Sequence, residues 1–175
     1  MTRSSVQREP APPMPVIGKR VARPKYALIP AERRHVDWCA VAVLLPLRLV
    51  SEANMRGAWQ VSSGRKKQHR SVTAMSLRTL AADFQWDNRT PLRITITRIA
   101  PAQLDDDNLA GACKATRDGV ADWLGVDDRD RRIEWRTAQE RGPVKTYGVR
   151  IEIREVTKAD RIAELEQALE EAKRA

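Results

Sequence analysis

The sequence predicts an α+β fold, in which a small mixed β-sheet is flanked by two main helices and followed by a C-terminal helix. Alternating segments predict strands, and segments with apolar residues at helical spacing predict helices. The chain has 175 residues and is 42% hydrophobic, which suffices for one domain with a real core. We expect a flexible basic arm over 1–35, one domain over 36–156 and an amphipathic helix over 157–175.

The N-terminal half is predicted to supply the arm, a first strand and a first helix. Residues 1–35 are rich in Pro, Arg and Ala and lack periodicity. The run "WCAVAVLLPLRLV" is β-branched and apolar, as in a buried strand. From Arg65 to Phe84 the apolar spacing is helical, and the first turns of this helix carry Arg65, Lys66, Lys67 and Arg70. A helix dipole disfavours cations there, so they are either kept for a phosphate backbone or simply well solvated.

The centre of the chain contains the clearest strand and the clearest helix. In "PLRITITRI" the apolar and polar residues alternate, which predicts a strand over 91–99. An acidic stretch follows at the exit of this strand. Beyond it, apolar residues from Leu109 to Leu124 recur at helical spacing, and Gly125 is a natural C-terminal stop.

The C-terminal part is predicted to form a hairpin and a final helix. The alternating runs "RIEWRTA" and "YGVRIEI" are joined through Gly142 and Pro143, which is typical of a β-hairpin. Thr157 is a candidate cap for the final helix, whose apolar stripe contains Ile162, Leu165 and Leu169. This helix is too short for an autonomous coiled coil, so we expect it to dock on the domain or on a second subunit.

The charge is unevenly distributed along the chain, whose formal net charge is +9. Residues 1–100 contain 18 Lys and Arg against 6 Asp and Glu, whereas 101–175 contain 14 against 17. A basic surface attracts polyanions, which makes nucleic acid the leading partner class, although a merely soluble basic protein gives the same totals. Two separated cysteines, Cys39 and Cys113, indicate neither disulfides nor zinc. Without a membrane-length apolar run or a signal peptide, we expect a cytoplasmic location.

The stretch "LDDDNL" is the candidate metal site. Asp105 and Asp107 are two positions apart and point the same way in extended geometry, where they form half of a site for a hard cation. Oxygen ligands favour Mg²⁺, with Mn²⁺ as the alternative. About twenty positions later, "VDDRD" supplies Asp128 beyond the helix. Because the helix runs away from the strand end, a neighbouring strand end, another turn of chain or a second subunit must bring Asp128 close to Asp105 and Asp107. The alternative to a metal site is a structural role for the stretch, in which Asp106 or Asn108 caps the helix.

A second alignment lies within the predicted helix. Asp107, Gly111, Lys114 and Asp118 fall on one stripe if Asp107 is in the first turn. Lys114 would then point along the carboxylate side, where an ammonium group could neutralise charge that develops on a phosphate. Spacing alone favours a simpler interpretation, a surface ion pair between Lys114 and Asp118.

The segment from "ITITRI" through "LDDDNLAGACKATRDGVADWLGVDDRDRRIEW" to "GVRIEI" resembles the RusA family of Holliday-junction resolvases, especially its phage and prophage relatives. The family pattern is D-x-D-N, a helix bearing Lys and Asp, then D-D before a strand. The resemblance implies that Asp105, Asp107 and Asp128 are metal-binding catalytic acids and that Lys114 is the assisting cation. In this chain five residues separate Asn108 from Lys114, where the best-known members have two.

The resemblance also implies a Mg²⁺-dependent endonuclease that resolves four-way DNA junctions as a symmetric homodimer. The upstream "LVSEANMRGAW" resembles the family's early loop, which brings Asn54 near the site, and we assign Arg56 with it to DNA contact. The cations that we assign to the DNA backbone are Arg65, Lys66, Lys67 and Arg70. Two alternatives stay open: a non-catalytic DNA-binding module, and a nuclease that acts on other branched or duplex DNA.

Overall fold

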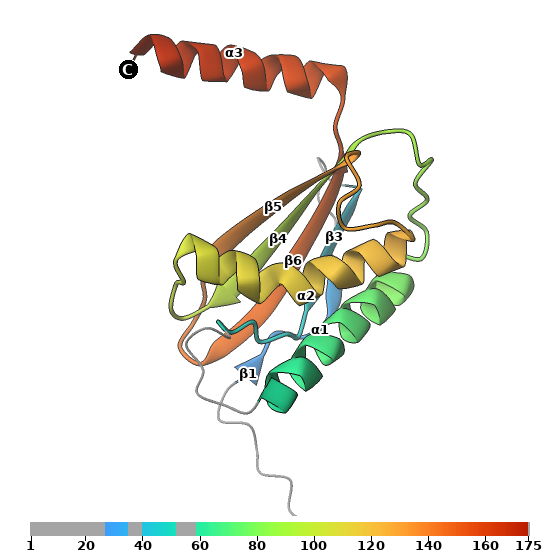
Figure 1. The fold of residues 1–175 in the computed structure, drawn as a ribbon, viewed down its shortest axis with the longest axis vertical. Coiled ribbons are helices and arrows are strands. Elements are labelled where there is room, and N and C mark those ends of the chain that lie inside the picture. Colours follow the sequence, from blue (N-terminus) through green and yellow to red (C-terminus); the bar gives the residue numbers. More distant parts are fainter. Residues whose placement is uncertain (1–26, 35–39, 52–58, 175) are drawn as a thin grey trace, which may run out of the picture.

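The computed structural model describes residues 27–34, 40–51 and 59–174, which form six strands and three helices. Their bounds are β1 Ala27–Leu28, β2 Glu32–Arg34, β3 Val41–Leu45, α1 Trp59–Leu80, β4 Leu92–Ala100, α2 Asp106–Leu124, β5 Ile133–Arg141, β6 Thr146–Glu155 and α3 Lys158–Arg174. One mixed sheet contains all six strands, and α1 and α2 lie together on one of its faces (Figure 1). The predicted α+β fold class is confirmed.

The order of the strands differs from the sequence prediction. The sheet runs β2-β3-β6-β4-β5, with β1 added beside β6. Because β4 lies between β5 and β6, these two strands do not pair and the predicted hairpin is wrong. Instead, β4 pairs in parallel with β5 and antiparallel with β6. The turn at Gly142 and Pro143 therefore carries the chain past β4, and the Gly142 amide donates a hydrogen bond to the Ala100 carbonyl oxygen.

A β4–α2–β5 crossover positions the acidic segments. Parallel strands require a connection that returns the chain to the starting end of the sheet, and α2 provides it. The Asp105 end of α2 therefore follows the exit of β4, and Asp128 precedes the entry to β5 at the opposite end of the helix. Gly125, with φ of 71°, ends the helix as predicted, because glycine adopts the left-handed conformation readily.

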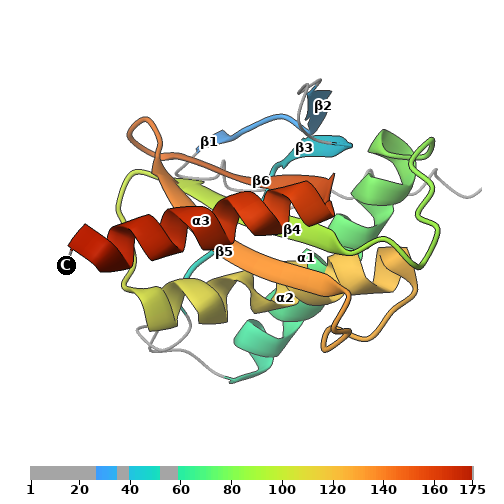
Figure 2. The ribbon, with the colours of Figure 1, turned by 90° about the horizontal axis from the view of Figure 1, so that it is seen from above.

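The first helix begins earlier than the sequence predicted. It starts at Trp59 and ends at Leu80, so Phe84 lies outside it. The basic residues expected in its first turns therefore fall in its second and third turns, beyond the strongest part of the helix dipole. Viewed from above, α1 and α2 lie together on one side of the sheet (Figure 2).

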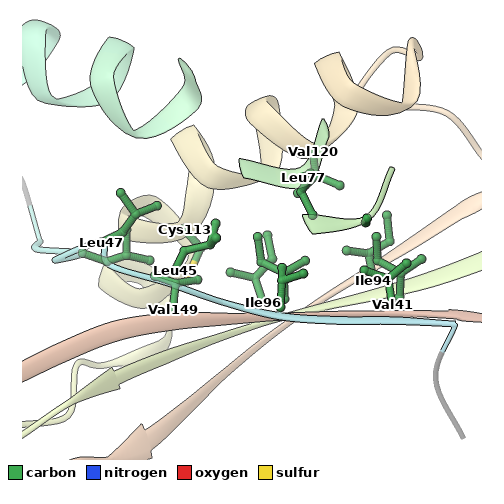
Figure 3. Packing of buried hydrophobic residues seen from close by; sticks show 14 of the residues in the cluster. Val41, Leu45, Leu47, Leu77, Ile94, Ile96, Cys113, Val120 and Val149 are labelled. Carbon is green, nitrogen blue, oxygen red and sulfur yellow. The ribbon is translucent and has the colours of Figure 1, made fainter. Parts of the chain in front are cut away.

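The hydrophobic core fills the space between the sheet and these two helices. Figure 3 shows Ile94 and Ile96 of β4 directed toward Val120 and Cys113 of α2 and toward Leu77 of α1. All five side chains are at most 1% exposed. Burial raises the pKa of the Cys113 thiol to about 11, so this cysteine is an inert core residue, as expected.

The C-terminal helix α3 attaches to the domain through charged side chains. Glu164 pairs with Arg93 of β4, which is only 3% exposed, and lies 3.6 Å from both Arg136 and Arg154. At the start of the helix, Asp160 accepts hydrogen bonds from the Thr157 amide and hydroxyl groups, which confirms the predicted cap. In Figure 1, α3 extends away from the rest of the sheet.

Two strands, β1 and β2, lie within residues 27–34, which were predicted to belong to the arm, and both pair with other strands of the sheet. Gly148 of β6 permits the close approach of Ile29, since a Cβ atom there would lie 2.7 Å from the Ile29 side chain. The predicted site residues Asn54 and Arg56 lie outside the described residues. No helix in the described part of the chain has the length and apolar character needed to cross a membrane.

Candidate functional site

Asp105 begins α2 as its N-cap. Its carboxylate accepts hydrogen bonds from the Asn108 amide at 2.9 Å and from Asn108 Nδ2 at 2.8 Å. These bonds hold the pKa of Asp105 below its ordinary value, the backbone bond having the largest effect. Neither Asp106 nor Asn108 is the cap; the cap is Asp105, which was predicted to bind metal and which has this structural role as well.

Asp107 lies in the first turn of α2 and is exposed. It lines a groove of about 380 Å³ between α1 and α2, which we call the α1–α2 groove. Within the described residues its carboxylate has no hydrogen bond or ion pair. Beside it, the Ser51 hydroxyl donates a hydrogen bond to Asn108 Oδ1, and this contact fixes the amide next to the groove. Among the described residues, Asp107 is therefore a carboxylate without a partner in the first turn of α2.

The α1–α2 groove brings together the stripe of α2 and three of the five cations that were predicted to contact DNA. The stripe predicted from spacing is confirmed, since all four of its members line the groove. Opposite them, α1 contributes Lys66, Lys67 and Arg70. Arg65 faces a different cavity, which lies beside Arg48 and His69. The groove is lined by Ser51, Lys66, Lys67, Arg70, Asp107, Asn108, Gly111, Lys114, Ala115 and Asp118.

Arg70 is held in place by Asp122 of α2. Its Nε and Nη2 atoms donate to the two carboxylate oxygens at 2.5 and 2.7 Å. This paired geometry is the strong form of an arginine–carboxylate contact, and it lowers the pKa of Asp122. Arg70 thus joins the two helices, whereas Lys66 and Lys67 are exposed and carry no such bond within the described residues.

Lys114 lies between two carboxylates at the far end of the groove. Its Nζ atom is 3.4 Å from Asp118 Oδ1 and 3.7 Å from Asp128 Oδ2. The pair with Asp118, which spacing favoured, is present, and Asp128 joins it. Lys114 is 67% exposed, so its ammonium group can turn toward a ligand at little cost. A second hollow, lined by Asp128 and by Arg70, Lys114 and Asp118, continues the groove in this direction.

The loop that carries Asp128 is fixed by two side chains. Trp135 Nε1 donates to the Asp128 carbonyl oxygen at 3.0 Å, and Arg117 Nη2 donates to the same oxygen. The Arg117 guanidinium also lies 4.9 Å from the centre of the Trp135 ring and 3.8 Å from the Asp128 carboxylate. Trp135 packs on the core and is partly buried.

The three predicted metal ligands do not converge within one chain. Lys114, which touches Asp128, is seven residues from Asp107, or about 10 Å along the helix. Among the described residues there is no group of three or more His, Cys, Asp or Glu side chains that could hold a metal ion. Asp107 nevertheless fits Mg²⁺, which binds through one or two carboxylates with the substrate phosphates and water as its other ligands. Asp118 and Asp128 form a second pair of oxygen donors.

Sequence reasoning missed two residues that shape the site. Ser51 follows the first strand without any motif, and Asp122 is separated from Arg70 by 52 positions, so only tertiary packing reveals them. A scan against protein-family models and a search of curated proteins both found no match to this chain.

Proposed function

We propose that this protein is a Mg²⁺-dependent endodeoxyribonuclease that cleaves branched DNA, with four-way junctions as its substrate. The observation that carries the proposal is the α1–α2 groove, where an uncommitted Asp107 faces the exposed Lys66 and Lys67. A phosphodiester backbone needs cations to bind it, and its hydrolysis needs carboxylates that hold a divalent ion. The groove contains both kinds of group, and the sequence resemblance to RusA resolvases points to the same chemistry.

Each part of the groove has a distinct task in this proposal. Lys66 and Lys67 bind phosphates of one strand, and the Arg70–Asp122 pair keeps the two helices at a fixed separation. Asp107 holds Mg²⁺ at one end, and Asp128 provides carboxylate oxygen at the other. When bound, Mg²⁺ lowers the pKa of a coordinated water and neutralises charge on the scissile phosphate.

Lys114 is the residue that changes partner in this scheme. In the described structure its ammonium group neutralises Asp118 and Asp128. A phosphate that enters the groove competes for Lys114 and leaves the two carboxylates with excess negative charge. That charge favours a divalent cation, so binding of DNA and binding of metal reinforce each other.

The test uses a labelled four-way junction and a linear duplex of matched sequence, each with and without Mg²⁺. We expect paired incisions in the junction only when Mg²⁺ is present, and little cleavage of the duplex. Equal cleavage of both substrates would assign the protein to nucleases of another specificity. An absence of incision with either Mg²⁺ or Mn²⁺ would reject the enzymatic proposal.

A non-catalytic DNA-binding module is the competing function. It is favoured by Asp105, which acts as a helix cap, and by Asp128, whose charge Lys114 and Arg117 already neutralise. A module of this kind binds junctions but shows no thermal shift when Mg²⁺ is added without DNA. The proposed nuclease does show one, because Asp107 gains a cation in the folded state only.

The homodimer is also part of the proposal, and α3 supplies a surface for it. The acidic face of α3 contacts the sheet, where Glu164 pairs with Arg93. The apolar residues Ile162, Leu165 and Leu169 of α3 are 56%, 71% and 57% exposed. A second copy of α3 complements this stripe in charge as well as shape. Parallel pairing places Glu166 opposite Arg161 of the second copy.

We expect Leu165→Glu to shift the protein toward the monomer, because a carboxylate would enter the centre of the paired stripe. Ala163→Glu is the matched control, since it adds the same group outside the stripe. Sedimentation velocity over a range of protein concentrations measures the fraction of dimer. This fraction should depend on concentration, because a pair of such short helices associates weakly. Identical sedimentation of both variants and the parent chain would exclude α3 as the dimer interface.

A further inference from the structure

A separate cavity of about 410 Å³ lies between α2 and the edge strand β5, on the opposite side of α2 from α1. Ile96 and Cys113, each 1% exposed, give it an apolar floor. Its volume is within the range of about 300–1,000 Å³ that is typical of small-molecule sites. None of the described residues that line it carries a carboxylate. We call this cavity the edge pocket.

One wall of the edge pocket is a fixed aromatic and cationic stack. The Arg117 guanidinium lies over the Trp135 ring, and both side chains are anchored to the Asp128 carbonyl oxygen. Arg117 Nε is buried and has no hydrogen-bond partner among the described residues. Nucleobases stack on aromatic rings and on guanidinium planes alike. The wall therefore offers a preorganised planar surface.

The rim of the edge pocket is cationic and polar. Lys114 and Arg136 lie on it, together with the Thr137 hydroxyl group. The carboxylate partners of these cations lie outside the pocket: Lys114 pairs with Asp118 and Asp128, and Arg136 pairs with Glu134. An apolar floor, a planar stack and a cationic rim match the three parts of a nucleotide, its base, sugar and phosphate. A purely apolar ligand would not use the cationic rim, and a simple anion would leave the stack and floor unused.

The edge pocket and the α1–α2 groove meet at the exposed ridge of α2. Gly111 and Lys114 line both of them, and the open space around Gly111 leaves the passage between them clear. A DNA strand that binds in the groove can therefore place a neighbouring nucleotide in the edge pocket. We propose that the edge pocket binds one unpaired nucleotide of the DNA strand that occupies the groove.

This inference rests on the proposed function and gives it a substrate class. A base within duplex DNA is stacked and paired, so it can enter the edge pocket only by leaving the double helix. A base beside a branch point has lost stacking on one side and pays less of this cost, and an unpaired base pays least. The edge pocket therefore selects DNA with unpaired nucleotides over continuous duplex, before any bond is broken.

The experiment measures binding by the full chain in EDTA, so that it does not depend on cleavage. The probes are a duplex with a short oligothymidine flap and the same duplex without the flap. We expect the parent protein to prefer the flap. Trp135→Leu should weaken binding to the flap about 5- to 100-fold, the range for loss of one base stack, and leave duplex binding unchanged. Trp135→Phe keeps a ring without the indole N–H group and should retain most of the preference.

A second variant tests the edge pocket without changing Arg117 or Trp135. Ala110→Leu adds bulk to an exposed helical residue that lines the edge pocket, and Ala163→Leu on α3 is its matched control. We expect Ala110→Leu to reduce the preference for the flap and Ala163→Leu to leave it intact. The inference is overturned if the parent binds both probes equally, or if Trp135→Leu or Ala110→Leu keeps the full preference. A protein that prefers the flap but never cleaves would reject the proposed function alone.

Discussion

Asp107→Asn is expected to reduce Mg²⁺-dependent cleavage of a four-way junction by at least about a hundredfold, because it removes the carboxylate that holds the cation. The amide has the same size, and Asp107 makes no ion pair within the described residues, so the fold is preserved. Binding of the junction in EDTA should be unchanged, since Lys66 and Lys67 remain. Single-turnover cleavage and fluorescence anisotropy provide the two measurements.

Asp128→Asn should cause a similar loss of cleavage with binding nearly intact. Its neighbour supplies the matched control: the Asp127 carboxylate accepts a hydrogen bond from the Arg129 amide at 2.8 Å and lies outside the contact with Lys114. Asp127→Asn should therefore cleave normally. Retained nicking by the Asp107 or Asp128 variant would refute the assignment of that residue.

The second large effect is expected at the crossing of the two helices. Gly119 of α2 packs directly on α1, and a Cβ atom there would lie 2.5 Å from the Arg70 carbonyl oxygen and 2.8 Å from Thr73 Cβ. Backbone must move to relieve these contacts. We expect Gly119→Ala to lower the free energy of unfolding by about 1–3 kcal/mol, measured by urea denaturation, and to widen the α1–α2 groove.

Gly111 on the same helix is the matched control for that substitution. Among the described residues nothing lies within 4 Å of a Cβ atom at this position. Gly111→Ala should raise the free energy of unfolding by about 0.5–1 kcal/mol, since alanine loses less backbone entropy in a helix. If both alanine variants have the same stability, close packing at Gly119 does not set the separation of the helices.

Local patterns in this sequence predicted individual elements well. The alternation in β4 and the helical spacing in α2 are strong because each element is buried on a defined face. The Gly125 stop and the stripe from Asp107 to Asp118 follow from the same local geometry. These features depend only on neighbours within a few turns of chain.

Pairing between distant segments could not be predicted in the same way. Strands β5 and β6 alternate and are joined by a turn, yet each pairs with β4, because β4 can satisfy a partner on both of its edges. The contact of Arg70 with Asp122 and the hydrogen bond from Ser51 to Asn108 also depend on how α1 and β3 pack. Sequence spacing contains no information on these contacts.

The attachment of α3 has a practical consequence for experiments. Dissolved salt weakens attraction between partly exposed charges such as Arg154 and Glu164, whereas it screens the pair of Glu164 with the buried Arg93 much less. High ionic strength is therefore expected to loosen the outer contacts of α3 and to leave its anchor at Arg93 in place. We expect the position of α3 seen by solution scattering to depend on the salt concentration of the buffer.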